Sequence, residues 1–228
     1  MKGKRVFYSE LAYVVGILIL AFGTALMEKA DFGLSMVVAP AYLLHLKLSQ
    51  TFSFYTFGMS EYVFQAVLLI LMSILVHKFK ISYLLSFATA ILYGLLLDGM
   101  MGIVALFPLE GIVWQGVFFL AGFFICAIGI ALLFHTYIPP EAYEMFVKEF
   151  SEKYAVPIPK VKTTYDCCSC ALSIVLSFVF FGFGVFVGVK WGTVVCALLN
   201  GWMIGKISGW LEKRFDFKDA LSLRRKLN

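Results

Sequence analysis

The stretch from Ile112 to Phe134 reads IVWQGVFFLAGFFICAIGIALLF and contains no Asp, Glu, Lys or Arg. A helix needs about 20 apolar residues to cross the hydrocarbon core of a bilayer. Runs of similar length and composition recur along the chain, at residues 11–28, 57–76, 81–105, 167–189 and 191–211. The sequence therefore predicts an all-α polytopic membrane protein with six transmembrane helices, in a single membrane domain over residues 1–228.

The composition of the whole chain leads to the same class. Of its 228 residues, 61% are hydrophobic and 14% are charged, whereas soluble domains carry about 25% charged residues. A water-soluble globule is excluded. The net charge of +5 comes from Lys and Arg that lie between the apolar runs and form no single basic face, so we expect the lipid bilayer, and no nucleic acid, as the partner.

The distribution of Lys and Arg predicts the orientation. If the N-terminus is cytoplasmic, most of these residues fall in cytoplasmic loops, and outside there are only Lys29, Lys47 and Lys190. Short loops with this bias usually face the cytoplasm. We expect both termini to be cytoplasmic, the first apolar run to be a retained helix, and the basic tail 213–228 to attract anionic lipid headgroups.

The two halves of the chain are similar in sequence. A shift of 106 residues places Gly23 on Gly129, and a shift of 107 places Gly94 on Gly201. We expect a first repeat over 8–106 and a second over 112–212. Each half holds three spans, an odd number, so the second repeat is inverted relative to the first, as in many secondary transporters.

Each half also contains an additional short segment between its first two spans. Residues 31–45 are apolar enough to dip into the membrane as a re-entrant helix. Residues 137–150 begin with Pro139 and Pro140, which suit a first helical turn, and continue with Glu141 and Glu144, which suit the positive end of a helix. We expect this second helix to lie on the cytoplasmic surface.

Four polar residues within the spans are candidates for substrate binding, since such residues are costly in a membrane. Glu61 and Gln65 share one helix face at i, i+4 spacing. With Asp98 they could line an outward-facing polar cavity, although both acids could equally sit at the water interface. Asn200 is the most central polar side chain, and either binds a ligand or packs beside Gly201.

The remaining polar residues of the spans favour structural roles. Asp166 and Lys206 are expected to form an ion pair that neutralises two costly charges. Cys167, Cys168 and Cys170 favour packing, while metal, lipid or redox chemistry remains an alternative. With no Gly-rich phosphate loop, zinc-protease motif or nucleophile elbow, we expect no enzyme, no cofactor and no bound metal.

Several strings resemble a known family: Tyr83 to Asp98, Pro139 to Tyr143, Lys162 to Asp166 and Gly192 to Gly201. They are similar to the YczE/YyaS/YitT group of bacterial integral membrane proteins, particularly its DUF6198 branch. The resemblance implies a multi-pass protein of the bacterial cytoplasmic (inner) membrane and no assigned activity. Many YitT relatives carry a soluble C-terminal domain, and we expect none of its functions here, because only a short basic tail follows Leu211.

The favoured function is a small secondary transporter, or a transport subunit, for an unidentified small solute bound between the two inverted halves. This hypothesis rests partly on the analogy of architecture. The alternative is a non-transporting accessory protein that binds another membrane or cytoplasmic component through residues 139–166 and the basic tail. A membrane enzyme that uses the thiols near 167–170 is a third hypothesis.

Overall fold

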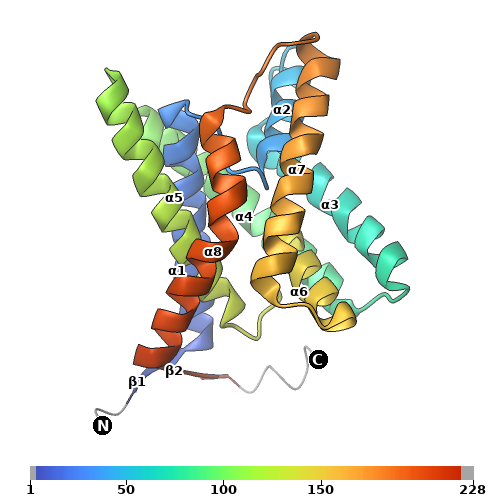
Figure 1. Ribbon diagram of the computed structural model, residues 1–228, viewed down its shortest axis with the longest axis vertical. Helices are drawn as coiled ribbons and strands as arrows, with labels where there is room; N and C mark the ends of the chain where they lie inside the picture. The colour runs from blue at the N-terminus through green and yellow to red at the C-terminus, as the bar shows by residue number, and fades with distance from the viewer. Residues whose placement is uncertain (1–3, 222–228) are drawn as a thin grey trace.

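A computed structural model describes residues 4–221 and has the all-α polytopic membrane fold (Figure 1). Six of its helices are long and apolar enough to cross a membrane: α1 (Ser9–Ala30), α3 (Phe57–Val76), α4 (Ile81–Ala105), α5 (Ile112–Phe134), α7 (Ile158–Phe181) and α8 (Trp191–Arg214). The described chain also has two short helices, α2 (Ala39–Leu48) and α6 (Ala142–Tyr154), and two short strands, β1 (Arg5–Tyr8) and β2 (Phe215–Lys218). The prediction of six spans is confirmed.

The fifth span lies earlier in the chain than the sequence indicates. The expected range was 167–189, but α7 covers Ile158–Phe181. Its first turns contain Lys162 and Asp166, which a hydropathy argument leaves outside the membrane, yet both are buried and paired with each other. The helix ends at Gly182, whose φ of +107° is open to glycine and strained for other residues.

The pair α1 and α5 forms the centre of the fold, because small residues let the two backbones approach closely. A Cβ built on Gly16 would lie 3.1 Å from the carbonyl oxygen of Gly129, and one on Gly23 would lie 2.9 Å from that of Gly122. Larger side chains at these positions would separate the helices. Both helices are therefore held at a distance that only glycine allows.

The two short helices start inside the protein. Ala39 at the start of α2 and Ala142 at the start of α6 are both fully buried. In Figure 1, α2 lies beside the upper half of α7 and α6 beside its lower half, and both helices contact α7. Parts of α6, such as Lys148 and Glu152, are exposed, but its first turn is buried inside the protein, which the expectation of a surface helix over 137–150 did not include.

Hydrogen bonds from the long helices hold the segment before α6 in the interior. The carbonyl oxygen of Pro139 accepts from Thr89 at 2.9 Å, and that of Pro140 accepts from Ser86 at 2.6 Å, both from α4. The segment before α2 is held similarly, since the Phe32 carbonyl accepts from the Gly192 N–H at 2.9 Å. These bonds satisfy backbone groups that would otherwise be unpaired in an apolar surrounding.

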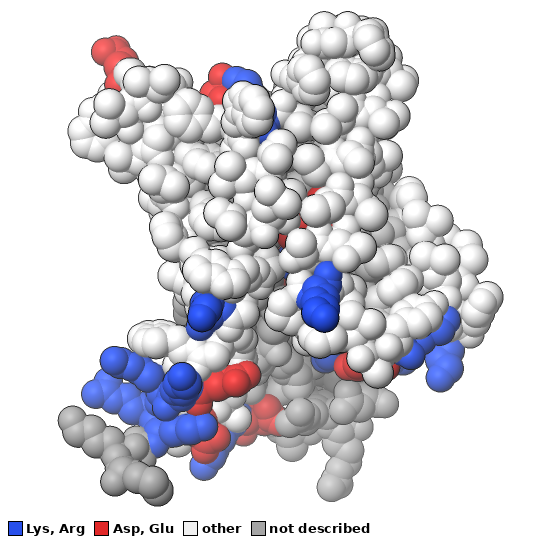
Figure 2. Space-filling model, viewed as in Figure 1, with Lys and Arg blue, Asp and Glu red and all other residues white. Residues whose placement is uncertain are grey.

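The two ends of the described chain meet at one end of the molecule. β1 pairs with β2 in parallel, with Arg5 opposite Phe215, and the Phe7 ring packs against Phe215 and Phe217. Lys and Arg gather at this end, in the lower half of Figure 2, while the surface above is mostly uncharged. The tail predicted over 213–228 thus begins as the end of α8 and a strand; its residues Arg224, Arg225 and Lys226 lie outside the described residues.

Candidate functional site

A cluster of polar side chains is buried where α3, α6, α7 and α8 meet. We call it the acidic cluster, because four of its members are carboxylic acids and one is a lysine. None of its members is more than 3% exposed. They are Glu61 and Gln65 of α3, Glu141, Tyr143 and Glu144 at the start of α6, Lys162 and Asp166 of α7, and Asn200 of α8.

One half of the cluster is organised by the Gln65 amide. Its Nε2 donates to Glu61 Oε2 at 3.1 Å and to Glu141 Oε2 at 3.2 Å. Its Oε1 accepts from the backbone N–H of Ala142 at 3.0 Å, which sets the orientation of the amide. The Tyr143 hydroxyl also donates to Glu61 Oε2, at 2.8 Å. Two carboxyl groups are therefore joined through one neutral side chain.

The other half of the cluster surrounds Lys162. Its Nζ lies 3.0 Å from Asp166 Oδ1, one helical turn along α7, and 3.6 Å from Glu144 Oε1 of α6. The Asn200 amide nitrogen donates to Asp166 Oδ2 at 3.4 Å. Lys162 thus neutralises charge on α6 and α7, and Asn200 ties α8 to the same group.

The position of α6 brings its acids into the cluster. Glu141 is the N-cap residue and Glu144 lies in the first turn, where the positive end of the helix dipole favours negative charge. The bonds from Ser86 and Thr89 to the two prolines direct this end of α6 inward. Glu141 and Glu144 thus lie at a helix start, as expected, but this helix start is in the interior of the protein.

Burial changes the proton affinity of the acids on α6. It raises the pKa of Glu141 well above its ordinary value, and the nearby carboxyls of Glu144 and Glu61 raise it further. Burial also raises the pKa of Glu144, an effect that Lys162 opposes. Both carboxyl groups therefore hold protons more tightly than they would in water.

Three of the four predicted substrate-binding residues lie together in the cluster, and the fourth does not. Glu61, Gln65 and Asn200 are members. Asp98 accepts instead from Thr56 Oγ1 at 2.8 Å and from the Gly58 N–H at 3.0 Å. Asp98 thereby satisfies an orphan N–H at the start of α3, which is a local structural role.

The ion pair predicted between Asp166 and Lys206 is wrong. Asp166 pairs with Lys162, four residues before it on the same helix. The Lys206 ammonium lies over the Trp202 ring, 5.7 Å from its centroid. Lys162 lies one turn from Asp166 on the same helix, so the charge of Asp166 is neutralised within α7. Lys206 of α8, the predicted partner, is not needed for this role.

The sequence reasoning missed Glu141, Tyr143, Glu144 and Lys162 as site residues. Glu141 and Glu144 were assigned to a surface helix, and Lys162 to a cytoplasmic loop. One signal could have found Lys162, since Lys162 and Asp166 have the i, i+4 spacing of a helical ion pair. For Tyr143 the sequence offers no comparable signal, because its role depends on where α6 meets α3.

A polar face continues along α7 from the cluster. Lys162, Asp166, Ser169, Ser173 and Ser177 follow one another at spacings of three or four residues, and all are buried. The Ser169 hydroxyl donates to the Met36 carbonyl at 2.7 Å, ahead of α2, and the Ser177 hydroxyl donates to the Val185 carbonyl at 2.6 Å. The buried side of this span is therefore polar over about 22 Å, at 1.5 Å per residue.

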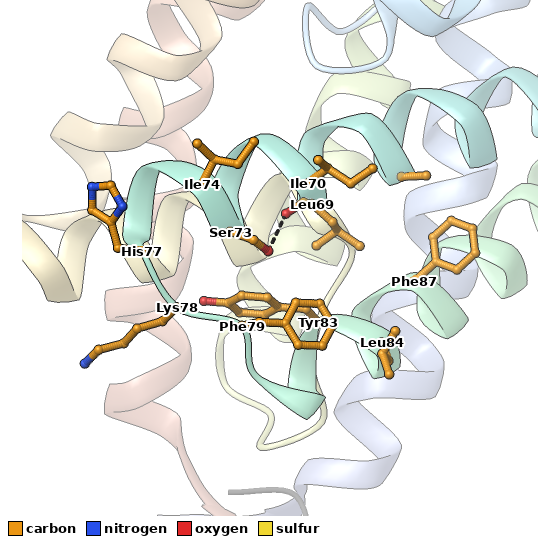
Figure 3. A pocket seen from close by; sticks show the side chains of 11 residues that line it. Leu69, Ile70, Ser73, Ile74, His77, Lys78, Phe79, Tyr83, Leu84 and Phe87 are labelled. Carbon is orange, nitrogen blue, oxygen red and sulfur yellow. Dashed lines mark hydrogen bonds between the residues drawn. The ribbon is translucent and has the colours of Figure 1, made fainter.

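An apolar groove of about 580 Å³ lies between α3 and α4 (Figure 3). Ile70, Ile74 and Leu84 line it, and His77 and Lys78 stand at the turn between the helices. The Ser73 hydroxyl is engaged with the Leu69 carbonyl at 2.8 Å. The groove therefore lacks the convergent polar groups that orient a polar ligand, and the acidic cluster is the better candidate site.

The cysteines do not form part of the cluster. Cys167 and Cys168 are exposed on α7, whereas Cys170 is buried. Within residues 4–221, no three His, Cys, Asp or Glu side chains lie close enough together to hold a metal ion.

Fold and site together define a multi-pass helical membrane protein with a buried cluster of ionisable groups. The model of a family of unknown function, DUF6198, matches residues 7–209, and the chain belongs to this family. No curated protein matches the chain, and no solved structure does.

Proposed function

We propose that the protein is a small secondary transporter, or a transport subunit, and that the acidic cluster binds its solute. The observation that carries this proposal is the burial of four carboxyl groups and one ammonium group inside a membrane protein. Such groups are expensive in a bilayer and usually mark the path of an ion or solute. A purely structural role would be served at lower cost by apolar residues.

The proposed site lies between two inverted halves, an arrangement that the contacts of α1 and α5 support. Under the shift of 106 residues, Gly16 corresponds to Gly122 and Gly23 to Gly129. Gly16 approaches Gly129, and Gly23 approaches Gly122, so each contact corresponds to the other. This is the relation expected of two similar units around a twofold axis. The cluster draws on both halves, with Glu61 from the first and Glu141 and Asp166 from the second.

The polar face of α7 supports a route for the solute. It extends for about 22 Å, most of the roughly 30 Å of a hydrocarbon core. The hydroxyls of Ser169 and Ser177 hold the segments that lie before α2 and α8. Movement of these segments would uncover or cover the face from the side opposite α6.

The proposed setting is the bacterial cytoplasmic membrane, within the YczE/YyaS/YitT group, with both termini in the cytoplasm. The gathering of Lys and Arg at the end that carries β1 and β2 supports this orientation (Figure 2). Anionic lipid headgroups are the proposed partners of the basic residues there, including Lys213 and Arg214.

A thermal-shift screen of the purified protein against libraries of metabolites, peptides and ions tests the proposal. A ligand of the folded state raises the unfolding temperature by mass action. We expect a ligand whose effect is lost in Glu61→Gln and kept in Asp98→Asn, which alters a carboxyl outside the cluster. A ligand that stabilises Glu61→Gln as strongly as the wild type would remove the cluster from solute binding.

A well-folded protein that no library member stabilises would favour the accessory function instead. That alternative places a membrane or cytoplasmic partner on residues 139–166 and the tail. The surface that such a partner could contact is smaller than the sequence indicates, because Glu141, Glu144 and Lys162 are buried. Lys148, Glu152 and Lys160 remain exposed, and their replacement would then abolish function.

A further inference from the structure

We propose that the acidic cluster binds protons, and that Glu61 and Glu141, joined by Gln65, are the pair that takes up and releases a proton. That this proton drives solute movement rests on the proposed function; that the pair binds a proton does not. The argument uses the charge, the contacts and the burial of the two carboxyl groups.

The cluster contains more carboxyl groups than cations, so bound protons would reduce its negative charge. It contains four carboxyl groups and one ammonium group, and Lys162 lies against Asp166 and Glu144. The hydrogen bonds that reach Glu61 and Glu141 come from neutral donors, the Gln65 amide and the Tyr143 hydroxyl. Glu61 is fully buried and Glu141 is 1% exposed. An ionised carboxylate so buried without a cation is strongly disfavoured, and a bound proton removes its charge.

The contacts leave a place for the proton on each group. Both carboxyls use Oε2 to accept from Gln65, while Glu61 Oε1 and Glu141 Oε1 are buried without a hydrogen-bond partner. A protonated carboxyl keeps an acceptor oxygen for the amide and carries its hydrogen on the other oxygen. The same arrangement thus accommodates either group in its neutral form.

Gln65 couples the two groups. Its orientation is set by the Ala142 N–H, so both of its own N–H bonds are available to the carboxyls. Loss of a proton from one carboxyl strengthens the hydrogen bond of that group with Gln65, and the other carboxyl accepts from the same nitrogen. Protonation of Glu141 at the start of α6 therefore changes the hydrogen bonding of Glu61 on α3 through Gln65.

Other ionisable groups act on the pair, and among residues 4–221 Lys162 is the cation that lies beside them. Lys162 opposes protonation of Glu141, whereas Glu144 favours it. Further groups that act on the pair or lie beside it are Tyr13 of α1, Tyr93 of α4, Cys126 of α5, Tyr143 of α6, and Tyr165 and Asp166 of α7. The phenols and the thiol are neutral at neutral pH, so the charges beside the pair are those of Glu144, Asp166 and Lys162. Lys162 is already paired with the other two, which leaves no cation for Glu61 and Glu141.

Infrared spectroscopy of the purified protein in lipid nanodiscs tests the proposal without a known solute. The carbonyl stretch of a neutral carboxylic acid is well separated from the bands of a carboxylate, and it shifts in heavy water. We expect this band at neutral pH, and we expect it to vanish as the pH is raised. Glu141→Gln and Glu61→Gln should each remove or shift the intensity of a single carboxylic acid, while Glu152→Gln, at an exposed position of α6, should leave the band unchanged.

Absence of the band from the wild type at neutral pH would overturn the proposal, whatever the variants do. So would a band that persists at full intensity in both Glu61→Gln and Glu141→Gln. Stabilisation of the wild type by sodium or potassium ions, without the band, would assign the charge compensation to a metal ion instead. A band that behaves as expected, with no ligand in the thermal-shift screen, would keep the proton site and remove the transporter.

Discussion

Replacement of Lys162 by Met tests whether the cluster depends on its single cation. The Lys162 ammonium lies 3.0 Å from Asp166 Oδ1 and 3.6 Å from Glu144 Oε1, and the side chain is 1% exposed. Met keeps the unbranched apolar stem and removes the charge. Loss of one partner from a buried ion pair costs about 3–5 kcal/mol, because the other partner is left buried and uncompensated.

Two further variants separate this effect from a simple loss of packing. Lys160→Met changes the same residue type at an exposed position of α7, so its effect should stay within about 0.5 kcal/mol. Lys162→Met combined with Asp166→Asn removes both members of the closer pair. The combined variant should recover a large part of the lost free energy of unfolding, since a neutral replacement of a buried pair is often tolerated.

The assay is equilibrium unfolding of each variant in mixed micelles, followed at neutral and at acidic pH. At acidic pH the carboxyls are protonated in both states, so the cost of Lys162→Met should shrink. Equal stability of Lys162→Met and Lys160→Met at neutral pH would refute the account of the cluster as a charge-compensated site.

Three other outcomes follow from the structure. Gly23→Ala would place a Cβ 2.9 Å from a backbone nitrogen of α5 and should lower the free energy of unfolding by about 1–3 kcal/mol. The control is Gly99→Ala, because a Cβ at Gly99 has nothing within 4 Å. In thermal unfolding of both variants, Gly99→Ala should be neutral or slightly stabilising. Because burial raises the pKa of Glu141, this carboxyl binds its proton more tightly in the folded state than in the unfolded state, and its contribution to stability falls as the pH rises above about 4.5. Glu141→Gln should flatten that fall in plots of unfolding temperature against pH, and parallel curves would contradict it. Phe7→Ala should loosen the strand pair and speed proteolysis at β2, while Tyr8→Ala, about half exposed, should leave the cleavage rate unchanged.

The apolar runs were sufficient to predict most of the spans, because a membrane helix needs about 20 predominantly apolar residues whatever its neighbours are. Five of the six predicted spans, the first four and the sixth, agree closely with α1, α3, α4, α5 and α8. The fifth does not, because Lys162 and Asp166 look too polar for a span until their pairing is known. The predicted duplication stays a prediction, which the approach of Gly16 to Gly129 supports.

The candidate site was predictable only in part. Glu61 and Gln65 stood out because they share a helix face within an apolar run, and Asn200 because it lies near the middle of another. The partners that give these residues their chemistry come from α6, which the sequence places on the surface. Asp98 looked equivalent to Glu61 by hydropathy, but a hydrogen bond to the Gly58 N–H assigns it to the start of α3.

The sequence by itself determined the class of protein and the number of spans, because both depend on local composition measured against the thickness of a bilayer. Only the tertiary structure decided that Glu141 and Glu144 face inward, that Lys162 pairs with Asp166, and that β2 lies beside β1. These arrangements depend on which polar groups find partners when distant segments meet. A buried charge is tolerated only beside its partner, and the linear order of residues does not contain that information.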